Sequence, residues 1–194
     1  MKYMLVDTSG KGLAVTVCDE KRTPFSSLFL TLDNSLSEKM LWAMDNFLSA
    51  SGLTTADIDR YYIVKGPGSF TGIRIGVGAL LGFCMAHGKE LTGISSLDAA
   101  AIISGRDRVK TAVKLRGTLY GFREYDFTEN RFSDYQTEKL TDIGDFFVVN
   151  SGSYPYDLSK AVLSDRFDMF TGDYAPMYMR PSEAEINFDQ RHGG

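Results

Sequence analysis

The feature that most constrains the fold is an apolar, glycine-rich helix that we expect over residues 73–87, with Gly88 as its C-terminal stop. Between positions 73 and 86 it carries one charged residue, Arg74, and no other strongly polar side chain. A helix without a polar face should be covered on nearly every side. It is therefore either a central core helix between a sheet and another helix, or a helix with one face on its own sheet and another on a partner protein.

Small residues recur along this helix at every fourth position. Gly72 and Gly76 form one such pair, and Gly78, Gly82 and Ala86 form a second row. Each glycine inside a helix costs roughly 1 kcal/mol relative to alanine. We therefore expect close packing to compensate, which both interpretations of the helix provide.

Strand and helix patterns alternate around this segment. Apolar runs between polar turns predict a meander of three strands, at 3–6, 13–18 and 25–32. A helix is predicted over 37–51, with Ser35 and Glu38 as a capping box, and a strand over 58–64. A strand at 91–94 and a helix over 97–103, capped by Ser95-Ser96, follow the apolar helix.

A charged turn at 104–107 separates this part from a second one in which strands dominate. These strands are expected at 109–115, 119–127, 132–137 and 146–150, with a short helix at 182–186. We predict an α/β fold of two lobes. Residues 1–104 form the first lobe, and 105–194 form a shorter second lobe whose C-terminal segment packs back on the first.

The composition excludes several classes of function. The chain has 194 residues and is 43% hydrophobic, so it can bury a core and is not intrinsically disordered. A net charge of −4 argues against a protein that binds nucleic acid alone. Two histidines, His87 and His192, leave little for zinc binding or Ser-His and Cys-His catalysis. Cys18 and Cys84 lie in apolar stretches and are expected to be buried thiols.

The N-terminal apolar run is too short for a signal peptide. The longest apolar stretch, 75–86, is short and glycine-rich for a membrane span. We therefore expect no membrane association and a cytoplasmic protein.

A glycine-rich turn, Gly66-Pro67-Gly68-Ser69-Phe70-Thr71-Gly72, joins the strand at 58–64 to the apolar helix. Exposed backbone N–H groups at a helix N-terminus favour a phosphate. The segment lacks the Gly-Lys-Ser/Thr ending of a P-loop, and its glycine spacing is not that of a dinucleotide fingerprint. The alternative is a tight structural turn in which proline and glycine supply the required backbone angles.

The extended segment Gly66-Pro67-Gly68-Ser69-Phe70-Thr71-Gly72-Ile73-Arg74-Ile75-Gly76 closely resembles the signature of the bacterial TsaB (YeaZ) family. Asp7-Thr8-Ser9, Ser95-Ser96-Leu97 and residues 176–185 also resemble segments of that family. The resemblance runs along the whole chain, strongly over 1–100 and weakly over 104–173. Leu36 departs from the usual histidine at the head of the first helix, and Lys114-Leu115-Arg116 departs from an Asp-Ala-Arg-like segment.

The resemblance implies an actin/Hsp70/sugar-kinase-like (ASKHA) fold of two small lobes, each with a mixed β-sheet and helices. It also implies an accessory protein, itself not an enzyme, in the formation of N6-threonylcarbamoyladenosine (t6A) in tRNA. Such a protein pairs with a catalytic TsaD-like paralogue and a TsaE-like ATPase. Together they transfer threonylcarbamoyl from its adenylate to the adenosine next to the anticodon.

The same resemblance implies contact with tRNA through the complex and a homodimer when the partner is absent. We expect no cofactor on this chain alone, with ATP or ADP at the complex interface. The catalytic paralogue holds a metal with two histidines four positions apart on a helix. Because His87 and His192 cannot form that pair, we expect no metal site here.

In this family the paralogues meet through first-lobe helices, which favours the partner interpretation of the apolar helix. The candidate interface residues are Met40, Met44, Arg74, Gly78, Leu81, Gly82 and Met85. The candidates for the family motif or a phosphate loop are Asp7, Thr8, Ser9, Gly66, Pro67, Gly68, Ser69, Phe70, Thr71, Gly72 and Arg74.

Two other functions stay open. One is a small-molecule kinase of the same fold, with Asp7 near the nucleotide metal and the loop 66–72 on a phosphate; the second lobe is short for an adenosine pocket. The other is a secreted or surface peptidase, which the lack of a metal pair or a Ser-His set disfavours.

Overall fold

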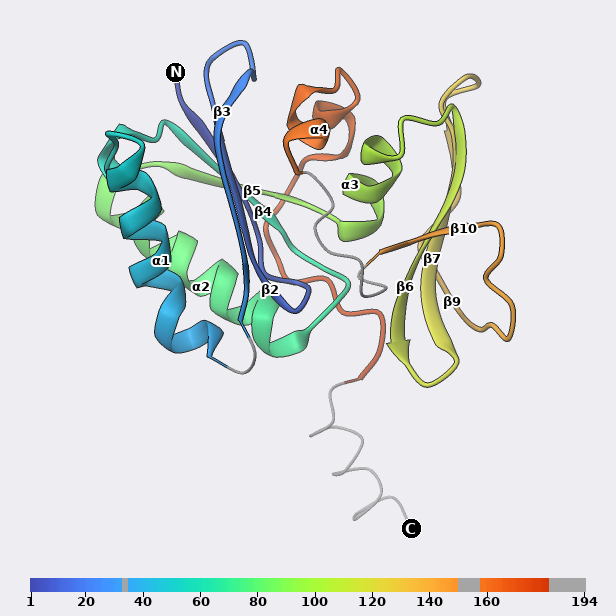
Figure 1. The fold of residues 1–194 in the computed structure, drawn as a ribbon. Helices are drawn as coiled ribbons and strands as arrows, with labels where there is room; N and C mark the ends of the chain where they lie inside the picture. Colours follow the sequence, from blue (N-terminus) through green and yellow to red (C-terminus); the bar gives the residue numbers. More distant parts are fainter. Residues whose placement is uncertain (33–34, 150–157, 182–194) are drawn as a thin grey trace, which may run out of the picture.

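The protein is built from four layers, in the order helices, sheet, helices, sheet (Figure 1). The structure is a computed structural model that describes residues 1–32, 35–149 and 158–181. Helices α1 and α2 cover the outer face of the first sheet, and α3 and α4 lie on its other face, where α3 also packs against the second sheet. The predicted α/β fold with two mixed sheets and helices is confirmed.

The first sheet has the strand order β3-β2-β1-β4-β5. Its strands are β1 (Tyr3–Asp7), β2 (Gly12–Cys18), β3 (Pro24–Thr31), β4 (Arg60–Val64) and β5 (Glu90–Ile94). The first three pair antiparallel as the predicted meander, and β4 and β5 run parallel to β1. Asp7 and the loop after β4 therefore lie at the same edge of the sheet, because they follow neighbouring parallel strands.

Alternation along the strands separates two cores. Met4 and Val6 of β1 face the outer layer, formed by α1 (Leu36–Ala50) and α2 (Phe70–His87), with η1 (Thr55–Asp57) beside them. Leu5 faces the other layer, formed by α3 (Ser96–Ile103), α4 (Leu158–Leu163) and η2 (Phe167–Phe170). Period-two alternation is what a sheet covered on both sides requires.

Capping residues in the neighbouring sequence set the ends of helices α2 and α3. Gly88 adopts the left-handed conformation that ends α2, and Ser95 accepts a hydrogen bond from the Asp98 N–H at the start of α3. The capping box expected at Ser35 and Glu38 is wrong, because no side-chain cap hydrogen bond forms there. Helix α2 also begins three residues earlier than predicted, at Phe70, because Ser69 caps it.

The second sheet has the order β10-β6-β7-β8, with β9 also paired to β7. Its strands are β6 (Arg108–Arg116), β7 (Leu119–Asp126), β8 (Arg131–Phe132), β9 (Gln136–Lys139) and β10 (Phe146–Val149). The single strand predicted at 132–137 is wrong, since β8 and β9 pair with different parts of β7. The helix predicted at 182–186 lies outside the described residues.

A buried ionic network ties α3 to the second sheet. The Asp98 carboxylate accepts hydrogen bonds from Arg123 Nη1 and Tyr125 OH, each at 2.7 Å, and from Tyr135 OH at 2.5 Å and Ser95 Oγ at 2.6 Å. Its side chain is 2% exposed. Burial, and the charge of Asp98 as a lesser cause, raise the pKa of Tyr135 to about 12, so the hydroxyl remains a donor at neutral pH.

Residues 171–181, here called the C-terminal strap, return to the first lobe. Gly172 and Gly93 of β5 exchange two backbone hydrogen bonds of 2.9 Å. Lys65 Nζ lies 3.1 Å from Asp173 Oδ2, and the Met177 N–H donates to the Lys65 carbonyl at 2.8 Å. The strap thus runs from β5 to the glycine-rich loop before α2.

Helix α2 as a whole, Phe70–His87, has the length and composition of a membrane span, although the apolar stretch 75–86 within it is shorter. A third of this 18-residue helix is buried inside the protein. Because core helices of globular proteins also pass this test, the feature is weak evidence for a span.

Candidate functional site: the glycine-rich loop and the open face of helix α2

The loop 66–72 is fastened to the Asp7-Thr8-Ser9 turn. Ser9 N–H donates to Asp7 Oδ1 at 2.6 Å, and Ser69 N–H donates to the Ser9 carbonyl at 2.8 Å. From the other side, Ser96 Oγ donates to the Pro67 carbonyl at 2.7 Å. The structure therefore brings together the Asp7-Thr8-Ser9 turn, the loop 66–72 and the start of α3.

Three glycines make this contact possible. A Cβ at Gly68 would overlap the Ser9 carbonyl oxygen, one at Gly72 the Thr8 carbonyl oxygen, and one at Gly76 the Thr8 hydroxyl. Gly66 has a positive φ of 102°. Backbone N–H groups of Ser69 and Gly72 are already used, the latter by Ser69 Oγ at 3.2 Å. These contacts favour the structural-turn interpretation of the loop, and the phosphate interpretation stays a prediction.

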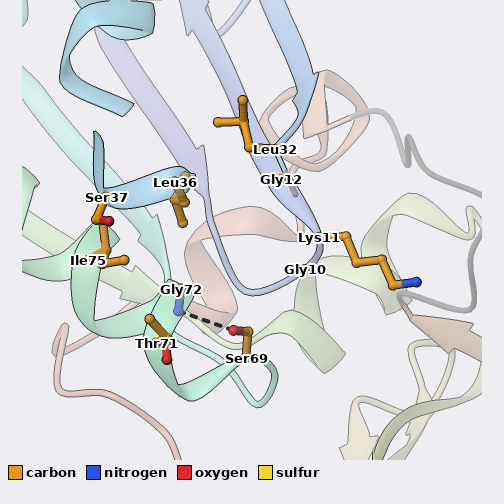
Figure 2. Close-up of a pocket in the computed structure, with 10 residues that line it drawn as sticks. All are labelled: Gly10, Lys11, Gly12, Leu32, Leu36, Ser37, Ser69, Thr71, Gly72 and Ile75. Atoms are coloured by element: carbon orange, nitrogen blue, oxygen red, sulfur yellow. Dashed lines mark hydrogen bonds between the residues drawn. The ribbon is translucent and has the colours of Figure 1, made fainter. Parts of the chain in front are cut away.

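A cavity of about 490 Å³ borders the loop (Figure 2). It is lined by Gly10, Lys11, Gly12, Leu32, Leu36, Ser37, Ser69, Thr71, Gly72 and Ile75. The dashed line in Figure 2 is the Ser69–Gly72 cap at its edge. Of the predicted phosphate-loop residues, Ser69, Thr71 and Gly72 reach the cavity. Leu36, which departs from the family pattern, supplies part of its apolar wall.

Gly72→Ala is expected to destabilise the protein by about 3 kcal/mol, because the new methyl group meets backbone that cannot move aside. Gly82→Ala is the matched control within the same helix. Nothing described lies within 4 Å of a Cβ at Gly82, so alanine should stabilise by about 1 kcal/mol. Urea unfolding of both variants measures the difference. Equal stabilities would contradict this account of the loop.

The outward face of α2 is open. Gly78, Gly82 and Met85 are exposed, Met85 at 83%, and Leu81 is half-buried. Among the described residues nothing lies within 4 Å of a Cβ at Gly78 or Gly82. The expectation that this helix is covered on nearly every side is therefore wrong for the chain by itself. Its buried residues, such as Ile73 and Leu80, pack on the first sheet.

Two of the predicted interface residues are in the wrong place. Met40 and Met44 are 1% and 0% exposed, because they form the core-facing stripe of α1. The large exposed apolar residues of α1 are Leu41 and Trp42, at 53% and 67%. Trp42 falls off the apolar stripe in the sequence, which is the signal that could have identified this surface.

An aromatic and arginine cluster lies at the N-terminal end of α2. The rings of Phe70 and Tyr178 stack with centroids 4.4 Å apart. The guanidinium of Arg74 lies 5.3 Å from the Tyr178 ring centroid, and that of Arg180 lies 4.9 Å from the Phe70 centroid. The strap thus adds Tyr178 and Arg180 to the surface formed by Phe70 and Arg74 of α2. Neither strap residue is among the candidate site residues predicted from the sequence.

The two cysteines are buried, and His87 contacts a threonine hydroxyl. Both cysteines are free and buried as predicted, and burial raises the pKa of Cys18 to about 12 and that of Cys84 to about 11. His87 Nε2 lies 2.9 Å from Thr55 Oγ1. Within the described ranges no cluster of three or more His, Cys, Asp or Glu residues could hold a metal. His192 lies outside them.

The sequence of the chain is similar to those of known proteins. The family model "TsaD: tRNA N6-adenosine threonylcarbamoyltransferase" matches residues 32–113. The protein named tRNA threonylcarbamoyladenosine biosynthesis protein TsaB of Escherichia coli K12 is 28% identical over 67% of this chain and 57% of its own length. The TsaB of Haemophilus influenzae is 30% identical over 57% of this chain and 45% of its own. The chain therefore matches about half of these relatives.

Solved structures show the same fold. YeaZ from Pseudomonas aeruginosa superposes with a TM-score of 0.63 at 21% identity, over 74% of this chain and 69% of that one. A second structure, described as an uncharacterized protein with similarity to peptidase YeaZ, gives 0.64 at 18% identity, over 99% and 93%.

The two mixed sheets with their helix layers place the chain in the actin/Hsp70/sugar-kinase-like fold class. Within that class, the chain is similar in sequence to relatives named TsaB and in fold to structures named YeaZ.

Proposed function

We propose that this chain is a non-catalytic subunit for t6A formation in tRNA, and that it activates a TsaD-like catalytic paralogue by pairing with it. The observation that carries the proposal is the open face of α2, where Gly78 and Gly82 leave room for the backbone of another helix. Exposed apolar surface of this kind is a common mark of an interaction site. The names of the relatives supply the biosynthetic context.

The chemistry of the chain supports an accessory role. Thiols with a raised pKa are poor nucleophiles, and both cysteines are of this kind. The net charge of −4 is small and negative, so the partner would supply most of the phosphate contacts to tRNA. A TsaE-like ATPase completes the proposed complex, with ATP or ADP at its interface. A homodimer through the same face of α2 would form when the partner is absent.

The direct test is co-expression with the TsaD-like paralogue of the same genome, followed by pull-down and an assay of t6A in tRNA. Our proposal expects a stable pair, and modification that depends on both proteins. Modification by the paralogue at an undiminished rate without this chain would contradict it.

The cavity beside the glycine-rich loop favours a second candidate, a small-molecule kinase of the same fold. Calorimetry of the isolated chain with ATP and Mg²⁺ separates the two. We expect weak binding or none, because the loop glycines pack directly against the Asp7-Thr8-Ser9 turn and the N–H groups of Ser69 and Gly72 already have acceptors. Tight binding would favour the kinase.

A further inference from the structure

Most of the hydrogen-bond donors of the Arg74 guanidinium are unused among the described residues. It is exposed on the first turns of α2, and its Nε donates to the Tyr178 hydroxyl at 2.9 Å. In the part of the chain that the structure describes, Arg74 has no other hydrogen bond or ion pair. Both terminal NH2 groups of the guanidinium are therefore available to a group from outside.

Tyr178 is fixed independently of Arg74. The strap that carries it is held by the backbone bonds of Gly172 and Met177, and by the ion pair of Lys65 with Asp173. Its ring stacks on Phe70 at an interplanar angle of 3°. Because these contacts already place the hydroxyl, Tyr178 orients the guanidinium rather than the reverse.

The position of Arg74 on α2 indicates what it meets. Arg74, Gly78 and Gly82 are spaced by four, so they lie along one side of the helix, with Arg74 at its N-terminal end. A partner helix seated on the two glycines would pass beside the guanidinium. Arg74 and Arg180 of the strap are the two guanidinium groups described in the cluster at this end of α2, which is fewer cations than the several that a polynucleotide requires.

We propose that Arg74, positioned by Tyr178, binds a carboxylate on the helix of the partner protein that packs on the open face of α2. The planar guanidinium fork matches a carboxylate with two parallel hydrogen bonds, which a lysine cannot make. This inference rests on the proposed function, and it makes Tyr178 a positioning residue for pairing.

The test is a double-mutant cycle on the full chain, with the Kd for the TsaD-like paralogue measured by calorimetry. Arg74→Ala is expected to weaken pairing by about tenfold or more, and Arg74→Lys to recover part of the loss. Tyr178→Phe keeps the stack on Phe70 and should weaken pairing about threefold. In the Arg74→Ala background it should have no further effect. Unchanged thermal unfolding would exclude a general loss of structure.

The outcomes separate this inference from the proposed function, with Gly82→Leu as the reference variant. If Gly82→Leu abolishes pairing and Arg74→Ala does not weaken it, the inference is wrong and the proposed function stands. If Gly82→Leu pairs normally, the open face of α2 is not the pairing surface and this inference fails with it, whereas the proposed function fails only if the unaltered chain does not pair with the paralogue. An equal effect of Tyr178→Phe in both backgrounds would overturn the positioning role. If the Arg74→Ala chain pairs normally but the resulting complex no longer binds tRNA, Arg74 binds tRNA and the carboxylate assignment is wrong.

Discussion

Gly82→Leu is expected to abolish pairing with the catalytic paralogue while the chain stays folded. The position is exposed, and among the described residues nothing lies within 4 Å of a Cβ there, so leucine fits the isolated protein and favours the helix. In the pair, its side chain would occupy the space that the partner backbone needs. We expect the affinity to fall by about 100-fold or more, since overpacking a close helix contact separates the two backbones.

Size-exclusion chromatography of mixtures with the paralogue measures this effect. Lys160→Leu is the matched control, because it adds a leucine at an exposed position of α4 on the other side of the first sheet. The control should elute as a complex, and Gly82→Leu as separate proteins with unchanged circular dichroism. An unaltered complex with Gly82→Leu would contradict the proposed interface.

Asp98→Ala is expected to destabilise the protein by about 3–5 kcal/mol. The change leaves the guanidinium of Arg123, which is 16% exposed, without its carboxylate, and removes the acceptor of the Tyr125 and Tyr135 hydroxyls. A buried charge without a partner is among the costliest defects in a protein interior. Since Asp98 lies on α3 and Arg123 on β7, the loss should loosen the second sheet from the first lobe.

Chemical unfolding measures the free-energy loss, and Asp134→Ala is the matched control. Asp134 is exposed close to the same network, and its replacement should change stability by less than about 0.5 kcal/mol. Tyr135→Phe, which removes a single donor to Asp98, should fall between the two. Equal stability of Asp98→Ala and Asp134→Ala would show that the network does not hold the layers together.

Local periodicity predicted most of the first lobe because its elements depend on neighbouring residues. The apolar stripe of α1 and the stop at Gly88 are features of short stretches of chain. The same stripe caused the error at Met40 and Met44, since an apolar helical face indicates burial and cannot by itself distinguish a core from an interface. The open side of α2 became visible only when the layers around it were known.

Contacts between distant residues could not be predicted from a single sequence. Asp98 with Arg123, and Arg74 with Tyr178, depend on how the second sheet and the strap return to the first lobe. The two short strands β8 and β9 were merged in the prediction because strand length there is set by pairing with β7 and not by composition. The close contact of Gly72 with Thr8 likewise needs the parallel pairing of β1 and β4.

The most direct test of the central claim, that the open face of α2 is the pairing surface, is methionine oxidation by peroxide with and without the paralogue. Met85 on α2 is 83% exposed, and Met169 on η2 is 51% exposed and serves as an internal control. Because oxidation requires access to the sulfur, pairing through α2 should slow the oxidation of Met85 severalfold and leave Met169 unchanged, relative to the free chain kept dilute enough to be monomeric. Formation of the pair with Met85 as reactive as in the free protein would contradict the account.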